Sequence, residues 1–447
     1  MIRSGRETFS GSRFGLAMTM IGVAVGLGNV WRFPYMVGKF GGLAFVTFYV
    51  AVVVFVGVPA LMAEWALGRH TRRGPVGAFA AAGLPLGRSI GWFFFFVVAA
   101  ATAYYTSVIG WVAYHAVGQL ALGKGRTLAA SAILPPASGF DLRSFALQAL
   151  ATGLVILACA AVLLRGLRRG IERVSRFITP ALFAALVVLV VRSVTLPGAA
   201  EGIRWYLLRF DPGDLTPRVM VAAMGQAIFS LSLGGTFMVV YGSYLGDRDD
   251  LRRSAGWTAF GDTAAGLLAG LAIIPAVFAL GHEASSGPGL LFSTLPAVFR
   301  EIPAGWLFGF LFFAALLGAA YLSDVAAFEV LVAGLTDNTR LGRRAAVWWM
   351  ASAVFLLSLP PSLNMNVFFA WDLTFGSGMQ TLGALVAVVT IVWVIGRAEA
   401  LRELAAGGGE PFPLWLYYWM RYAVPGAVLA VGVWWVLTDL LGVMAGV

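Results

Sequence analysis

The sequence predicts an all-α polytopic membrane protein in which two of about eleven membrane-spanning helices are broken near the middle. Of the 447 residues, 60% are hydrophobic and only 12% are charged, whereas a soluble domain has about 25% charged residues. Long apolar segments follow one another along the whole chain, and two of them contain glycine-rich interruptions. This composition excludes a soluble multidomain protein.

The apolar segments have the length of about 20 residues that a helix needs to cross a bilayer. Several are longer, and we expect those helices to tilt or to protrude from the membrane. The eleven predicted spans cover residues 13–38, 42–67, 88–120, 146–165, 171–193, 217–245, 255–281, 305–335, 343–360, 366–396 and 414–441.

The basic residues predict how the chain is oriented. The net charge is +10, and arginines gather in the loops that follow the second, fourth and eighth spans. Such loops favour the cytoplasmic side of a membrane, and these three share the side of the N-terminus. We therefore expect a multi-pass protein of the plasma (inner) membrane with a cytoplasmic N-terminus and an outer C-terminus. Its partners would be membrane lipid and a small solute, without nucleic acid.

The first span is interrupted by the run from Gly22 to Pro34, which contains three glycines, Asn29 and Arg32. Glycines at such spacing often form a face on which a neighbouring helix packs closely. Alternatively, the helix is broken, and its freed carbonyl and N–H groups bind ions and an anion. Asn29 and Arg32 favour the broken helix, because a packing face needs neither an amide nor a guanidinium.

The sixth span has a second interruption between Gly225 and Thr236, with two serines and a pair of glycines. The first and sixth spans are corresponding positions if the chain consists of two five-span halves and one further span. Interruptions at corresponding positions indicate the binding site of a transporter built from inverted repeats. The predicted division is therefore residues 1–193, 194–397 and 398–447.

Acidic residues inside apolar spans are costly, and they suggest function unless a hydrogen bond explains them. For Glu64 and Glu329 a structural hydrogen bond is the favoured interpretation, because each lies toward a span end. For Asp262 and Asp324 a functional role is favoured, because each lies deeper in its span and follows or precedes a hydroxyl residue.

The run that ends in Arg32-Phe33-Pro34 resembles the neurotransmitter:sodium symporter family, specifically its bacterial and archaeal amino-acid transporters. Gly41-Gly42, Glu64-Trp65, Tyr104-Tyr105 and Asp262-Thr263 extend the resemblance over nearly the whole chain. The family is itself a known example of broken-helix binding sites. The resemblance implies a 5+5 inverted-repeat fold with one extra C-terminal helix, and sodium-coupled symport of an amino acid by alternating access. It implies no enzyme activity and no organic cofactor.

The resemblance implies one or two sodium ions. The first would be bound by the carbonyl of Ala24, the amide of Asn29, the hydroxyl of Ser230 and the carboxylate of Asp262. A fixed carboxylate suits a hard cation, and it implies transport without chloride. The residues implied for the second ion are Gly22, Val25, Ala319 and Ser323. Leu322 stands where the family has an oxygen ligand, so the second ion stays open.

The substrate is expected to carry a carboxylate, which would be bound by the N–H groups of Leu27 and Gly28 at a helix start and by the Tyr105 hydroxyl. The other residues implied to line the substrate pocket are Val23, Ala24, Ala101, Phe229, Ser230, Ser232, Gly235, Ser323, Asp324 and Ala327. Several of these are small, which favours a bulky neutral or aromatic amino acid. An inward-pointing Asp324 would instead favour a cationic amino acid, since an unpaired buried carboxylate is costly.

The resemblance also implies two gates formed by ion pairs, Arg32 with Asp372 outside and Arg6 with Asp337 inside. Two alternatives stay open beside the cationic carrier. The same fold could work without sodium or with protons, given Leu322 and Asp324. A membrane-embedded enzyme would need a nucleophile and a base, and the sequence offers no evident partner for a catalytic histidine.

Overall fold

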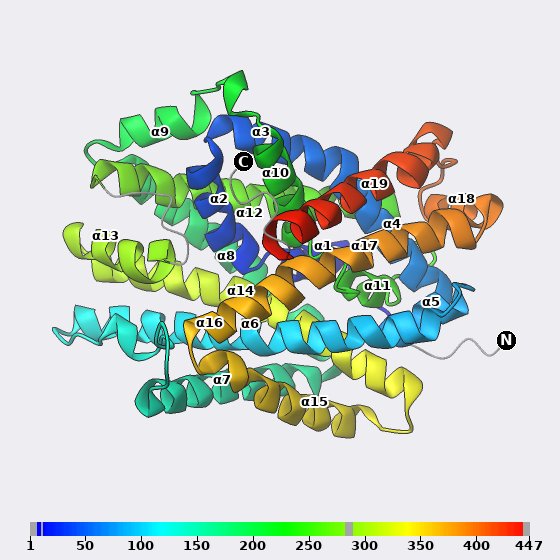
Figure 1. Cartoon of the computed structure of the whole chain (residues 1–447), viewed down its shortest axis with the longest axis horizontal. Coiled ribbons are helices and arrows are strands. Elements are labelled where there is room, and N and C mark those ends of the chain that lie inside the picture. The colour runs from blue at the N-terminus through cyan, green and yellow to red at the C-terminus, as the bar shows by residue number, and fades with distance from the viewer. Residues whose placement is uncertain (1–6, 10–11, 282–288, 441–447) are drawn as a thin grey trace.

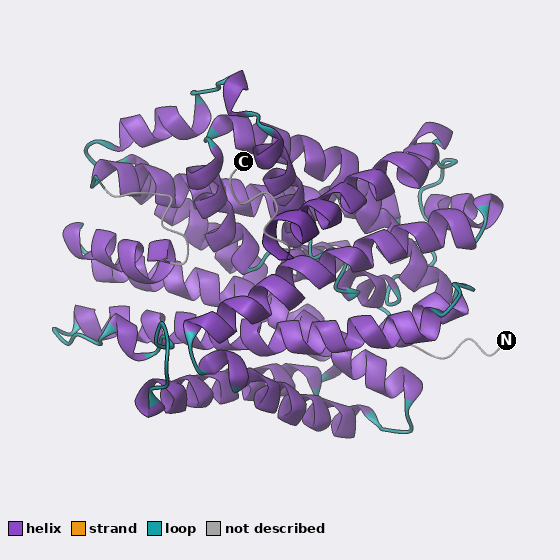
Figure 2. Ribbon diagram, in the orientation of Figure 1, coloured by secondary structure: helices purple, strands orange, loops and turns teal. Residues whose placement is uncertain are grey.

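The computed structural model describes residues 7–9, 12–281 and 289–440, which form a helical bundle that contains no strand (Figures 1 and 2). Short π-helical and 3₁₀ segments connect or interrupt the α-helices. The α-helices are α1 (Arg13–Ala24), α2 (Phe33–Phe40), α3 (Leu43–Val52), α4 (Val58–Thr71), α5 (Pro75–Ala81), α6 (Gly87–Gly123), α7 (Leu142–Leu163), α8 (Arg173–Val194), α9 (Ala199–Leu207), α10 (Pro217–Ser230), α11 (Phe237–Gly242), α12 (Leu251–Ala279), α13 (Leu295–Glu301), α14 (Gly305–Asn338), α15 (Arg343–Ser358), α16 (Met365–Trp371), α17 (Gln380–Val389), α18 (Arg397–Ala405) and α19 (Leu414–Trp435).

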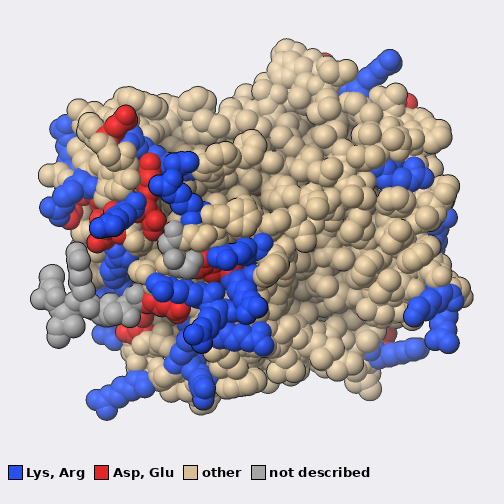
Figure 3. Space-filling model, turned by 180° about the vertical axis from the view of Figure 1, so that it is seen from behind, with Lys and Arg blue, Asp and Glu red and all other residues tan. Residues whose placement is uncertain are grey.

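Nine helices of the described chain are long and apolar enough to cross a membrane, and the bent pair Arg13–Ala24 and Gly28–Phe40 would make a tenth. The space-filling view agrees, because a broad uncharged band separates the charged side chains at the two ends of the molecule (Figure 3). The predicted sixth span is divided between α10 and α11 and is not among these spans. The predicted number of eleven is therefore not confirmed.

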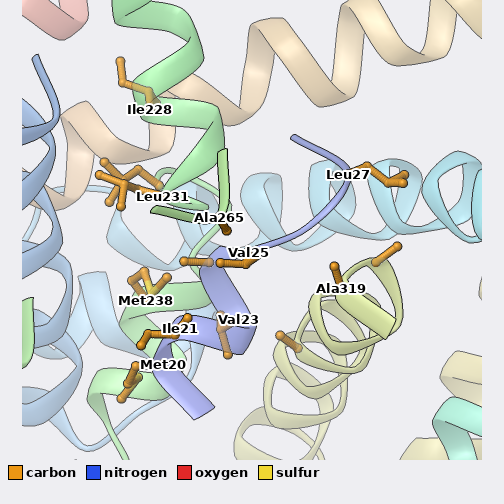
Figure 4. Close-up of a cluster of buried hydrophobic side chains, with 14 of the residues drawn as sticks. Met20, Ile21, Val23, Val25, Leu27, Ile228, Leu231, Met238, Ala265 and Ala319 are labelled. Carbon is orange, nitrogen blue, oxygen red and sulfur yellow. The ribbon is translucent and has the colours of Figure 1, made fainter. Parts of the chain in front are cut away.

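The first predicted break is present. Helix α1 ends at Ala24 because the next residue, Val25, has an extended backbone with φ −72° and ψ 115°. The chain leaves the helix at Val25 and runs on past Leu27 (Figure 4), and the helical parts Arg13–Ala24 and Gly28–Phe40 are bent by 58° relative to each other. The N–H group of Gly26, freed by this break, donates to the Asn29 Oδ1 over 3.0 Å. A side chain thus replaces the lost helical hydrogen bond.

The second predicted break lies between α10 and α11. Here Ser232, Gly234 and Thr236 have φ angles of +53°, +86° and +57°, a region that side chains disfavour. The Gly234 N–H donates over 2.7 Å to the Oε1 of Glu64, a buried carboxyl on α4. Glu64 therefore has the structural hydrogen bond that was expected of it.

The long helices α6 and α14 pack side by side along the length of the bundle (Figure 1). Helix α14 also packs against α1 and α8, and α12 packs against α1 and α8. Both breaks are thus enclosed by protein, which is where non-helical backbone can exist at membrane depth.

Gly234→Ala tests whether the second break needs glycine. A Cβ at this residue would lie 2.0 Å from the Gln380 carbonyl oxygen, and the positive φ adds strain. We expect a loss of about 2 kcal/mol or more of stability, measured as a lower melting temperature of the purified protein. The control is Gly256→Ala on α12, where a Cβ meets nothing within 4 Å. Equal melting temperatures for the two variants would contradict this explanation of the break.

Candidate functional site

A small cavity of about 70 Å³ lies between the two breaks. Its lining is mostly apolar, with a few hydroxyl and amide groups. The lining residues are Ala24, Gly26, Gly28, Asn29, Ala101, Thr102, Tyr104, Tyr105, Phe229, Ser230, Ser232, Phe237, Ser323, Ala327 and Gln380.

Most of the residues predicted to bind substrate line this cavity, but Val23, Leu27, Gly235 and Asp324 are not among them. Leu27 lines a second cavity that adjoins the first. A Cβ at Gly235 would lie 2.3 Å from the Gln380 Nε2, so its backbone is close behind that amide. Thr102, Tyr104, Phe237 and Gln380 were not predicted, because their approach to the cavity depends on how the helices pack.

One wall of the cavity offers hydrogen-bond donors beside the first break. The Leu27 N–H donates to the Tyr105 hydroxyl oxygen over 3.1 Å, so the hydroxyl proton remains for another acceptor. A Cβ at Gly26 would lie 2.7 Å from both the Tyr105 hydroxyl and the Ser323 Oγ. A Cβ at this residue would therefore crowd both hydroxyl groups. The hydrogen-bond donors on this wall suit a carboxylate.

A compact polar cluster lies beside the cavity and contains Asn29, Ser230, Asp262 and Tyr49, all of them buried. The Asn29 Nδ2 donates to the Ser230 Oγ over 2.8 Å and to the Asp262 Oδ1 over 2.7 Å. The Ser230 Oγ donates to the Asp262 Oδ2 over 2.6 Å. Three of the residues predicted for the first sodium ion are therefore in contact with one another.

Tyr49 is the member of this cluster that sequence reasoning missed. Its hydroxyl lies 3.2 Å from the Ser230 Oγ and 3.4 Å from the Asp262 Oδ2. A tyrosine in an apolar span was the available signal, but its partners lie on α10 and α12. In the described part of the chain, Asp262 forms no ion pair with a basic side chain. A buried carboxylate surrounded by neutral oxygen and amide groups suits a hard cation.

No cluster of three or more His, Cys, Asp and Glu side chains occurs within the described ranges, and those are the usual ligands for transition metals.

The residues predicted to bind a second ion lie near the first break, but only Ser323 among them has a side-chain oxygen. The Ser323 Oγ donates to the Val25 carbonyl over 3.1 Å. The Leu322 Cδ1 lies 2.8 Å from the position of a Cβ at Gly22, and the Thr179 Oγ1 lies 2.9 Å from the same point. Thr179 on α8 was not predicted from the sequence. Its hydroxyl lies near Gly22, close to Leu322, whose side chain has no oxygen that could bind an ion.

Asp324 points away from the cavity. Its carboxylate accepts hydrogen bonds from the Thr106 hydroxyl over 3.0 Å and from the Cys159 Sγ over 3.5 Å. Successive helical residues are rotated by about 100°, so when Ser323 lines the cavity, Asp324 faces α6 and α7. The geometry therefore does not support the prediction that Asp324 contacts the substrate.

The second cavity adjoins the first, and its lining also includes Arg32, Lys39 and Asp372. The Arg32 guanidinium lies 4.5 Å from the centre of the Phe229 ring, which lines both cavities. Arg32 and Asp372, the predicted outer pair, face this space without forming an ion pair within 4 Å. Arg32 and Asp372 therefore do not close the path from the second cavity to the first.

Beyond the second break along the chain, aromatic rings pack around the end of α11. The Phe9 ring packs against Tyr241 and Tyr244, with ring centres 6.5 and 6.3 Å apart. The Tyr244 hydroxyl donates to Glu329, which also pairs with Arg343 over 2.6 Å. Glu329 thus makes the structural interaction that was expected of it.

The predicted inner gate cannot be compared as a pair, because Arg6 lies outside the described residues. Its predicted partner Asp337 accepts a hydrogen bond from the Gly74 N–H over 2.6 Å.

Comparisons with known proteins agree with this architecture. The model of the "Sodium:neurotransmitter symporter family" matches residues 6–122 and 143–439. An uncharacterized sodium-dependent transporter of Bacillus subtilis, YhdH, is 34% identical over 97% of this chain and 98% of its own length. Another, MJ1319 of Methanocaldococcus jannaschii, is 31% identical over 89% of this chain and 84% of its own.

Among solved structures, the crystal structure of MhsT in complex with L-phenylalanine has a TM-score of 0.83 to this chain. It is 31% identical and covers 96% of this chain and 99% of its own. This likeness confirms the predicted fold class, with its broken first and sixth helices. The chain belongs to the sodium:neurotransmitter symporter family, and it is a multi-pass, sodium-dependent secondary transporter rather than an enzyme.

Proposed function

We propose that the protein is a symporter that couples sodium to the uptake of a bulky neutral amino acid. The observation that carries this proposal is the contact of Asp262 with Asn29 and Ser230, two residues that also line the cavity. A sodium ion at this cluster would therefore lie next to the substrate. The structure of MhsT with L-phenylalanine supports an amino acid as the substrate class.

The two binding events would assist each other through shared residues. Sodium would bind the Asp262 carboxylate, the Ser230 hydroxyl, the Ala24 carbonyl and the Asn29 amide, whose oxygen would turn from Gly26 toward the ion. The substrate carboxylate would bind the Leu27 and Gly28 N–H groups and the Tyr105 hydroxyl, close enough to add an oxygen to the ion. Each ligand would then raise the affinity for the other by the same factor.

The cavity supports a neutral substrate side chain. Ala101, Ala327 and Phe229 supply apolar surface of small and large size, and none of the described residues that line the cavity carries a carboxylate. A lysine-like substrate would therefore have to bury its charge without a partner, which is costly. Chloride would not be needed, because Asp262 already brings a fixed negative charge to the cation.

Alternating access would require the outer and inner sides of the cavity to close in turn. The second cavity adjoins the substrate cavity on the side of Arg32 and Asp372, and the packing of Phe9 against Tyr241 and Tyr244 supports a closed opposite side. We assign the side of Arg32 and Asp372 to the exterior, since the basic loops favour the cytoplasmic side. Approach of Arg32 to Asp372 would close the outer side. Separation of Arg6 from Asp337, as residues 1–193 and 194–397 move relative to each other, would open the inner side.

Asp262→Asn tests the sodium site. Wild-type protein in liposomes should take up labelled phenylalanine with an inward sodium gradient and not with potassium. The variant keeps the hydrogen-bonding shape but loses the charge, so we expect at least about tenfold lower sodium-dependent uptake. The control is Thr390→Ala, whose hydroxyl bonds only the Val386 carbonyl. Equal uptake in sodium and potassium, or uptake driven only by a proton gradient, would contradict the proposal.

Leu322→Thr tests how many ions bind. We propose that the first site dominates, because Leu322 gives no oxygen to the second. Adding a hydroxyl there should lower the half-saturating sodium concentration and raise the Hill coefficient for sodium from about 1 toward 2. Leu322→Val is the matched control, since it has the shape of threonine without the oxygen. A wild-type coefficient near 2 that Leu322→Thr leaves unchanged would contradict the single dominant site.

Asp324→Asn tests the cationic alternative. Because Asp324 faces Thr106 and Cys159, we expect the variant to bind phenylalanine within about threefold of wild type. Lysine should displace labelled phenylalanine from neither protein. Displacement by lysine from wild type, lost in Asp324→Asn, would show instead a cationic amino-acid carrier.

A further inference from the structure

Gln380 brings an uncommitted amide to the substrate cavity. It is the first residue of α17 and follows a π-helical stretch, Asp372–Met379. Such wide turns are often found at functional sites. The side chain lines the cavity together with Phe237, and a Cβ at Gly235 would lie 2.3 Å from its Nε2. The amide is therefore held against the backbone of the second break.

Five other polar side chains of the cavity already have partners within the protein. The Ser232 Oγ donates to the Val23 carbonyl over 3.1 Å, and the Thr102 Oγ1 donates to the Val98 carbonyl over 2.7 Å. The hydroxyls of Ser323 and Tyr105 and the amide of Asn29 are engaged at the first break and in the polar cluster.

The Gln380 amide differs from all of these. Within the described residues it has no hydrogen-bond partner, although it offers two N–H donors and a carbonyl acceptor. Water can satisfy it while the cavity is empty. A bound substrate would displace that water, and the amide would then need a partner on the substrate itself.

The wall on which Gln380 lies is different from the one that suits the substrate carboxylate. The groups for the carboxylate, the Leu27 N–H and the Tyr105 hydroxyl, belong to the first break and to α6. Gln380 lies with Gly235 and Phe237 at the second break. A substrate bound by its carboxylate at the first break would therefore turn its side chain toward other lining residues, including Gln380.

We propose that Gln380 is a specificity-determining residue that favours neutral amino acids whose side chain ends in a hydrogen-bonding group, such as a phenol hydroxyl or an amide. This inference rests on the proposed amino-acid transport. The amide carries no charge, so it cannot neutralise an acidic or basic side chain, whose burial stays costly. It discriminates against hydrocarbon side chains of the same size, because they leave it unpaired in a site without water.

The test compares binding of matched substrates to wild type and to Gln380→Met, which has a similar length and no amide. Tyrosine with phenylalanine, and glutamine with methionine, differ in the terminal group at nearly constant shape. Dissociation constants in sodium should favour the polar member of at least one pair in wild type. In the variant this preference should fall about tenfold, which corresponds to one hydrogen bond of about 1.4 kcal/mol.

Gln380→Asn serves as the conservative variant, because it keeps the amide on a shorter arm and should retain part of the preference. Gln380→Met should still bind phenylalanine only in sodium, which shows that it is folded and keeps its ion site. An unchanged ratio of polar to apolar affinities in Gln380→Met would overturn this inference while leaving the transport proposal intact. Absence of sodium-dependent binding of any amino acid to wild type would instead overturn the transport proposal.

Discussion

The rest of the structure depends on one constraint, which is that backbone groups freed inside a bilayer need partners from the protein. Each break meets this constraint with side chains. Asn29 accepts from the Gly26 N–H and Glu64 from the Gly234 N–H. The Tyr105 hydroxyl accepts from the Leu27 N–H. The partners come from both nearby and distant residues, so the breaks depend on the local sequence as well as on the packing of the bundle.

The hydrogen bonds made by the backbone N–H groups at the breaks also bear on how the site binds a ligand. A backbone N–H that is bonded to a hydroxyl or amide can exchange that partner for a ligand at little cost, because no bare group is exposed in the exchange. Asn29 is the clearest case, since it caps Gly26 with one end of its amide and contacts Asp262 with the other. Sodium binding there would change the hydrogen bonding of the first break, and with it the substrate site.

The sequence allowed the fold and much of the site to be predicted, because glycines, prolines and intramembrane polar residues leave a local signal. It did not identify Tyr49, Thr179 or Gln380, which reach the site from separate helices and sit in unremarkable local sequence. The direction of the Asp324 side chain was hard to predict for a different reason. Its neighbour Ser323 lines the cavity, and a rotation of one residue decides which of the two side chains does so.

The two buried carboxylates show why position matters more than charge alone. Asp262 contacts residues that line the cavity, so an ion or a proton can reach it with the substrate. Asp324 accepts only from Thr106 and Cys159, deep between α6, α7 and α14. Of the two, Asp262 is therefore the carboxylate that we propose to couple an ion gradient to the movement of a solute.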